Sequence, residues 1–193
     1  AGKPASMTLY NVNIVDTDKG RIRHGKTITI KDGIITDIRR AGRKMADDQT
    51  DMTGKYIMPG MIDSHVHWGN LAYDTKMAEV LSKDFLAAGV TTVRDLGSNY
   101  LNIKRHNESV DSGECQGPYV FYSALWAAGK YFMDPMDTIG WDKGSDAPWS
   151  RKINVRDLTD AEIEAAVTEA KEIGCTGFKI YIHYSKEDLS RMI

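Results

Sequence analysis

Two histidines stand one residue apart in the stretch PGMIDSHVHWG, residues 59–69. On a β-strand, residues i and i+2 point to the same face, so His65 and His67 are expected to project together. Two neutral imidazoles side by side offer nitrogen ligands that suit a divalent metal such as zinc, iron or nickel. An HxH pair is also a common strand feature, so the spacing alone leaves a purely structural role open.

A lysine lies in the middle of the apolar run GFKIYI. If this run is a buried strand, the ammonium form of Lys179 is costly, and desolvation favours the neutral amine. A neutral amine can capture carbon dioxide as a carbamate, an anion that can bridge two cations. A lysine that reaches solvent past the strand end explains the same pattern equally well. Tyr181 and His183 share the alternation of Lys179 and are candidates for a substrate pocket, with packing at a loop edge as the alternative.

Five further positions or groups carry weaker signals. Asp95 follows the β-branched run TTVR and could orient a histidine, or could cap a helix or a turn. Arg94 alternates away from Asp95 and is expected to be structural. His24 and His106 lie among polar neighbours and are predicted on the surface. A long loop is predicted over about residues 127–157, and its aspartates lack the spacing of an EF-hand and are expected to be solvated: Asp134, Asp137, Asp142 and Asp146.

The elements that must position these side chains fall into two groups. Residues 7–58 consist of short β-like runs with turn signals between them, and Asp32-Gly33 between two alternating runs predicts a hairpin. This segment is expected to form a small antiparallel sheet. From Gly60 onward, strand-like and helix-like segments alternate, which predicts a parallel sheet with helical crossovers. The predicted helices cover residues 74–88, 100–110, 159–173 and 185–193, and the predicted strands cover 61–68, 89–96, 119–124 and 177–182. Capping boxes are predicted at the start of the last two helices, Thr159 with Glu162 and Ser185 with Asp188.

Two interpretations of this alternation are open. Four strand–helix units are too few for a closed barrel of about 250 residues, so the chain forms an open doubly wound sheet or the first half of a barrel. A chain end inside a helix favours the half barrel. In both architectures active sites lie at the carboxyl ends of the strands, where His65 and His67 are placed.

The composition excludes few classes of function. The chain has 193 residues, 41% of them hydrophobic and 27% charged, with a net charge of −2, which gives no reason to expect nucleic acid as a partner. The basic cluster is short and is expected to be a solvated edge: Arg39, Arg40, Arg43 and Lys44. Cys115 and Cys175 form no metal-binding motif. No apolar run approaches the ~20 residues that span a bilayer, so no membrane is expected as a partner. The first residues carry no signal peptide, and the compartment stays open.

Several stretches in the same order carry a family resemblance: DGIITDI, TGKYIMPGMIDSHVHWG, GVTTVRDLGS and GFKIY. Together they resemble the amidohydrolase superfamily of metal-dependent hydrolases, and most of all its imidazolonepropionase-like subgroup. The resemblance implies an α/β fold, in which residues 1–58 form a small N-terminal β-sandwich portion. Residues 59–193 would form the first half, about four βα units, of a TIM-like (β/α)8 barrel. It also implies that His65 and His67 are the first-strand metal ligands, and that Lys179 is the fourth-strand lysine that is often carboxylated and bridges two metals.

The resemblance also implies what this chain lacks. The family takes further histidines from the fifth and sixth strands and an aspartate general base from the eighth, so no catalytic residue is expected within residues 1–193. The implied activity is hydrolysis of a C–N bond, in an amide, cyclic amide or dipeptide, by a water activated on one or two divalent metals, most often zinc. The chain alone is expected to be inactive and to need the missing barrel half or contacts with further copies. Two alternatives stay open: a non-catalytic half-barrel scaffold or partner-binding module, and an unrelated parallel-sheet domain whose HxH pair is structural.

Overall fold

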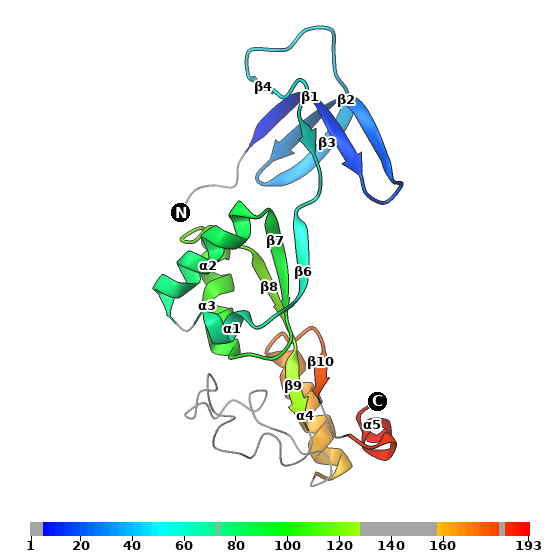
Figure 1. Cartoon of the computed structure of the whole chain (residues 1–193), viewed down its shortest axis with the longest axis vertical. Helices are drawn as coiled ribbons and strands as arrows, with labels where there is room; N and C mark the ends of the chain where they lie inside the picture. The colour runs from blue at the N-terminus through cyan, green and yellow to red at the C-terminus, as the bar shows by residue number, and fades with distance from the viewer. Residues whose placement is uncertain (1–5, 73, 128–157, 182–183) are drawn as a thin grey trace. The chain divides into compact units, whose positions relative to one another are not determined.

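The computed structural model describes residues 6–72, 74–127, 158–181 and 184–193 (Figure 1). The chain divides into two compact units, residues 1–60 and 61–193. The predicted boundary lies two residues earlier, between 58 and 59. Together the described elements make a mixed α/β structure.

The first unit is a five-stranded sheet. Its strands are β1 (Met7–Asp16), β2 (Arg21–Lys31), β3 (Ile34–Arg40), β4 (Gln49–Asp51) and β5 (Tyr56–Ile57), in the order β3-β2-β1-β4, with β5 also paired to β1. The predicted hairpin is confirmed, because β2 and β3 are antiparallel and both Asp32 and Gly33 have positive φ angles. Positive φ at both central residues is what a tight hairpin turn requires.

The prediction of a small antiparallel sheet is confirmed for β1, β2 and β3 and is wrong for β4 and β5, which run parallel to β1. The connection of residues 41–48 carries the chain past β2, so that β4 joins the far side of β1 in the same direction as β1. The small core of this unit contains Leu9, Val12 and Ile28.

The second unit contains parallel strands, as the alternation of its sequence predicts. One sheet has the order β6 (Met61–Val66), β7 (Val90–Asp95) and β8 (Tyr119–Tyr122), and a second pairs β9 (Ala124–Ala127) with β10 (Phe178–Tyr181). The single strand predicted over residues 119–124 is divided at Ser123. The Ser123 amide donates to the Asp95 carbonyl at 2.9 Å, whereas the next amide, of Ala124, donates to the Gly177 carbonyl at 3.0 Å. The chain thus leaves the ladder of β7 and joins that of β10 at this residue.

The helices of the second unit are α1 (Trp68–Leu71), α2 (Thr75–Ala87), α3 (Tyr100–Asp111), α4 (Asp160–Glu172) and α5 (Lys186–Met192). Helices α1, α2 and α3 lie together on one side of the β6-β7-β8 sheet (Figure 1). The core between these helices and the sheet is built from five buried side chains: Trp68, Ala72, Val93, Ile103 and Val120. A second core joins α4 to β9 through Ala124, Trp126, Ile163 and Ala170. None of the helices in the described ranges is long and apolar enough to cross a membrane.

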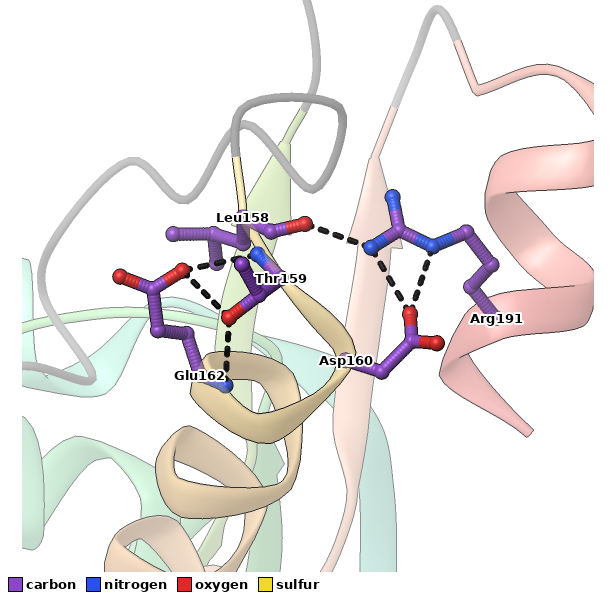
Figure 2. Close-up of polar contacts among 5 residues, drawn as sticks. All are labelled: Leu158, Thr159, Asp160, Glu162 and Arg191. Atoms are coloured by element: carbon purple, nitrogen blue, oxygen red, sulfur yellow. Dashed lines mark hydrogen bonds and ion pairs between the residues drawn. The ribbon is translucent and has the colours of Figure 1, made fainter.

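The start of α4 is fixed by side-chain contacts that the sequence predicted (Figure 2). The Glu162 amide donates to Thr159 Oγ1 at 3.3 Å, and the Thr159 amide donates to Glu162 Oε2 at 2.8 Å, which completes the capping box. The hydrogen bonds that the Thr159 amide and hydroxyl donate to the Glu162 carboxylate hold the pKa of Glu162 below its usual value. Arg191 of α5 donates to the Asp160 carboxylate at 2.9 Å and to the Leu158 carbonyl, so α5 is tied to the same helix start. The second predicted capping box begins α5.

Candidate metal site

The two histidines of the HxH motif lie next to each other at the end of β6. His65 is the penultimate residue of the strand, and His67 follows it directly as the N-cap of α1. Their ring centres are 5.6 Å apart with an angle of 66° between the planes, and both side chains are exposed. Two imidazoles that share one zinc at ~2.1 Å have ring centres roughly 5 Å apart. The spacing therefore suits one shared ion after a small adjustment of the rings.

A backbone carbonyl selects which nitrogen of His67 is available. His67 Nδ1 lies 3.2 Å from the Gly97 carbonyl oxygen. Because a carbonyl oxygen only accepts hydrogen bonds, this contact requires the proton on Nδ1. In the neutral ring Nε2 then carries the lone pair, which is the form that a metal ligand needs.

Asp95, at the end of β7, is fully buried beside this pair, and its carboxylate is held by backbone amides. Oδ1 accepts from the Gly97 amide at 2.9 Å, and Oδ2 accepts from the Gly69 amide at 3.0 Å. Burial raises the pKa of Asp95, whereas these amides and the nearby His67 act to lower it. Of the roles predicted for Asp95, the turn is present in the bond to Gly97, and the helix cap is present in the bond to Gly69 in the first turn of α1. The histidine contact is indirect, through the loop that carries the Gly97 carbonyl.

Sequence reasoning missed the two glycines that mediate these contacts. Gly69 and Gly97 offer backbone atoms only, and backbone acceptors carry no residue-type signal. The available hint was the spacing of DLG, in which the glycine stands two residues after the aspartate, as in turns made by aspartate side chains.

Arg94 and His24 lie as predicted. Arg94 Nε donates to the Ser64 carbonyl at 3.1 Å, a structural contact between β7 and β6. His24 is exposed and pairs with the Asn13 side chain at 3.0 Å.

His106 is not on the surface, and that prediction is wrong. The side chain is 3% exposed, Nε2 donates to the Pro118 carbonyl at 2.8 Å, and the ring centre lies 4.7 Å from that of Trp68. Burial lowers the pKa of His106, so the ring is kept neutral. The polar neighbours Lys104 and Arg105 misled the prediction, because on α3 they occupy the exposed side of the helix.

Lys179 lies in β10, where it pairs with Leu125 of β9, and its side chain is half-buried. Counted in chain order, β6 is the first parallel strand, β7 the second, the β8–β9 segment the third and β10 the fourth. The side chains of Tyr181 and His183 lie outside the described residues, as does the predicted loop with its aspartates. Over the described ranges, no three His, Cys, Asp or Glu side chains gather closely enough to hold a metal. The assignment of His65, His67 and Lys179 to one centre therefore stays a prediction.

A cavity of about 220 Å³ lies elsewhere in the second unit, between the start of α2 and the length of α3. Its lining includes Asp74, Glu79, Arg105, His106 and Cys115. Neither His65 nor His67 lines it, so the histidine pair and this cavity are separate features.

A known protein family matches the chain over residues 56–188, which include most of the second unit. The matched family is the amidohydrolase family. The chain belongs to it. Amidohydrolases typically bind a divalent metal, and the homologues of this chain are hydrolytic enzymes that act on C–N bonds.

Individual amidohydrolases match parts of the chain. An adenine deaminase from Ligilactobacillus salivarius is 34% identical over 91 residues, which are 47% of this chain and 15% of that protein. A D-hydantoinase from Ralstonia pickettii is 28% identical over 158 residues, 80% of this chain and 29% of that protein. The crystal structure of molinate hydrolase matches with a TM-score of 0.75 at 19% identity, over 100% of this chain and 51% of that one, which shows the fold alone. The chain thus spans less than a third of these curated relatives and about half of the solved structure.

Proposed function

We propose that the whole protein containing this chain is a metal-dependent hydrolase that cleaves the C–N bond of an amide, a cyclic amide or a dipeptide. The observation that carries the proposal is the pair His65 and His67 at the carboxyl end of β6, with Nδ1 of His67 committed to the Gly97 carbonyl. This geometry leaves imidazole nitrogens available to a metal. The match of residues 56–188 to the amidohydrolase family is the second support. Its relatives include proteins named for acting on adenine and on hydantoins.

In this proposal each part of the chain has a distinct role. His65 and His67 would hold a divalent metal, most often zinc, and a carboxylated Lys179 would hold it together with a second one. When bound, the metal would polarise the scissile carbonyl and lower the pKa of a coordinated water to about 7. Tyr181 and His183 contact the substrate, and the general base belongs to a part of the protein outside residues 1–193.

The architecture proposed around the site is a (β/α)8 barrel with a β-sandwich. The two parallel sheets, β6-β7-β8 and β9-β10, support the first four barrel strands, and the five-stranded sheet of the first unit supports the sandwich portion. Tyr119 and Phe121 add support, because they alternate with the buried Val120 and are 39% and 44% exposed. A barrel interior would cover that face of the sheet.

The test combines metal content with activity in the whole protein. Variants His65→Ala and His67→Ala are compared with His24→Ala, which removes an exposed histidine of the first unit. Metal is measured by mass spectrometry of the purified proteins, and hydrolysis is measured on adenine, hydantoins and dipeptides. We expect the wild type and His24→Ala to bind metal and hydrolyse at least one substrate, and the other two variants to lose both properties. Retention of metal and activity by either His65→Ala or His67→Ala would refute the proposal.

The carbamate has its own measurement. Carboxylation adds the mass of carbon dioxide to Lys179 and is lost in acid, so intact-protein mass at neutral and acidic pH detects it. Lys171→Ala, on the exposed side of α4, is the matched control for Lys179→Ala. An unmodified Lys179 in fully active, metal-loaded enzyme would remove this part of the proposal.

A second candidate is a non-catalytic half-barrel scaffold or partner-binding module. It is favoured by one observation, that the described residues offer no third His, Cys, Asp or Glu ligand near the histidine pair. Metal titration of residues 1–193 beside the whole protein separates the two candidates. Weak binding by the fragment and firm binding by the whole protein support the hydrolase, whereas no binding by either supports the module.

A further inference from the structure

A buried carboxylate connects helix α1, which follows β6, to the loop that follows β7. Asp95 is 0% exposed, and its two oxygens accept from amides that lie far apart in the chain. The Gly97 amide, at 2.9 Å, belongs to the loop that follows Asp95 itself, and the Gly69 amide, at 3.0 Å, belongs to the first turn of α1, whose N-cap is His67. Hydrogen bonds to a charged acceptor are about twice as strong as neutral ones. The carboxylate thus joins the helix start to the loop firmly.

Both segments adjoin His67. Gly69 lies two residues after His67 in the chain, and Gly97 supplies the carbonyl that faces Nδ1 at 3.2 Å. Both glycines are closely packed, because an added Cβ would lie 2.3 Å from the Asn99 carbonyl oxygen at Gly69 and 2.6 Å from Leu125 Cβ at Gly97. Asp95 therefore fixes both the backbone from which the imidazole projects and the acceptor to which its ring is bonded.

A turn alone would not require this arrangement. Asp51 shows the simple case, in which Oδ1 accepts from the Thr53 amide, two residues later, at 2.9 Å. Asp95 makes the same bond to Gly97, but its second oxygen accepts from Gly69 in the first turn of α1, 26 residues away in sequence. That second bond caps the helix that begins directly after His67, and a local turn does not account for it.

We propose that Asp95 is a positioning residue for His67, which acts through the Gly69 and Gly97 backbone to hold the imidazole in its Nδ1–H tautomer with Nε2 free. The carboxylate also lies close enough for its charge to act on the imidazole, and a negative charge there favours a donor N–H. The role of Nε2 as a metal ligand rests on the proposed function. The tautomer and its dependence on Asp95 rest on the geometry of this chain alone.

The first test is the tautomer of His67 in the whole protein without metal. Histidine labelled with ¹⁵N is observed by long-range ¹H–¹⁵N correlation at about pH 8, where imidazoles are neutral. The His67→Asn variant assigns the signals by their loss. We expect a protonated Nδ1 and an unprotonated Nε2. A wild-type His67 with its proton on Nε2 would overturn the proposal without any further variant.

The second test replaces the carboxylate. Asp95→Asn keeps the shape but places an NH₂ group against one of the two amides, and Asp51→Asn is the matched turn control. We expect Asp95→Asn to lose the Nδ1–H tautomer and to bind Zn²⁺ about 10- to 100-fold more weakly, the loss typical for a residue that orients a ligand. The control is expected to change neither. A folded Asp95→Asn protein with the wild-type tautomer and wild-type Zn²⁺ affinity would contradict the assignment.

Two further variants separate a failure of the Asp95 proposal from a failure of the proposed function. Asp95→Glu retains the charge, so it is expected to keep the Nδ1–H tautomer even if Asp95→Asn does not fold. An Nε2–H tautomer of His67 in Asp95→Glu counts against the proposal. If His67→Asn binds Zn²⁺ as tightly as the wild type, the proposed function fails. The tautomer spectra then still decide the role of Asp95.

Discussion

Replacement of Gly97 by alanine tests how closely the loop after β7 is packed against β9. Gly97 has a φ of +103°, a conformation that costs a residue with a Cβ about 1–2 kcal/mol. The added Cβ would lie 2.6 Å from Leu125 Cβ. Because that atom is bonded directly to the backbone, no rotamer change relieves the overlap, and overpacking of this kind costs about 1–3 kcal/mol more. The expected loss of unfolding free energy is the sum, roughly 2–5 kcal/mol.

Gly89→Ala is the matched control in the same unit. Gly89 also has a positive φ, +80°, but its nearest neighbour is the terminal methyl carbon of Met61 at 3.3 Å, the free end of a flexible side chain. The control therefore carries the backbone cost of about 1–2 kcal/mol and little else. The difference between the two variants isolates the packing of the loop against Leu125, about 1–3 kcal/mol.

The measurement is urea unfolding of the whole protein, followed by tryptophan fluorescence. Trp68 and Trp126 are both 1% exposed in the second unit, so their emission reports its unfolding. Equal stabilities of Gly97→Ala and Gly89→Ala would refute the reasoning, because they would mean that the loop yields freely. In that case the Gly97 carbonyl could not hold the imidazole of His67 in one place.

Three further predictions concern other parts of the second unit. Burial lowers the pKa of His106, so at acidic pH the unfolded state binds a proton that the folded state does not. The unfolding free energy is therefore highest at pH values above the unfolded pKa of about 6.5. It decreases as the pH is lowered through that value, by at most about 1.4 kcal/mol per pH unit. Urea unfolding of the wild type and His106→Gln at about pH 7.5 and 5.5 checks this, and equal pH dependence would contradict it. Thr159→Ala removes the cap of α4 and is expected to lower the unfolding free energy by about 0.5–2 kcal/mol, whereas Thr168→Ala, on the exposed side of the same helix, changes it little. Burial raises the pKa of Cys175 to about 12, so iodoacetamide is expected to modify Cys115 first at mildly alkaline pH, as peptide mass mapping would show; preferential labelling of Cys175 would disprove it.

The features predicted well from the sequence are those whose cause is local. The turn at Asp32-Gly33 needs positive φ at two neighbouring residues, and the capping box at Thr159 joins residues three apart. The family resemblance was also carried by a continuous stretch around His65. In each case the residues that create the feature are neighbours in the chain, so the sequence displays them together.

The features that were missed depend on residues distant in sequence. His106 is buried because Trp68 and Pro118 enclose it from other elements, while its neighbours along α3 are polar. The change of ladder at Ser123 depends on where β10 arrives after a long connection. The parallel pairing of β4 depends likewise on the path of the chain past β2.

The histidine pair combines both kinds of cause. Val66 pairs with Asp95 across the β6–β7 ladder, so alternation places His65 beside Arg94 on the opposite face from the Asp95 carboxylate. The contacts that orient His67 therefore come from the helix-covered side, through Asp95, Gly69 of α1 and the loop at Gly97. These hydrogen bonds all lie within residues 66–99, and Leu125 of β9 packs against the loop at Gly97. Orientation of the pair thus depends on neighbouring strands of the second unit, whereas in the proposed function the metal centre is completed by ligands from more distant strands. It follows that the tautomer of His67 should already be set in a chain that binds Zn²⁺ only weakly, and an NMR spectrum of residues 1–193 beside that of the whole protein would separate the two properties.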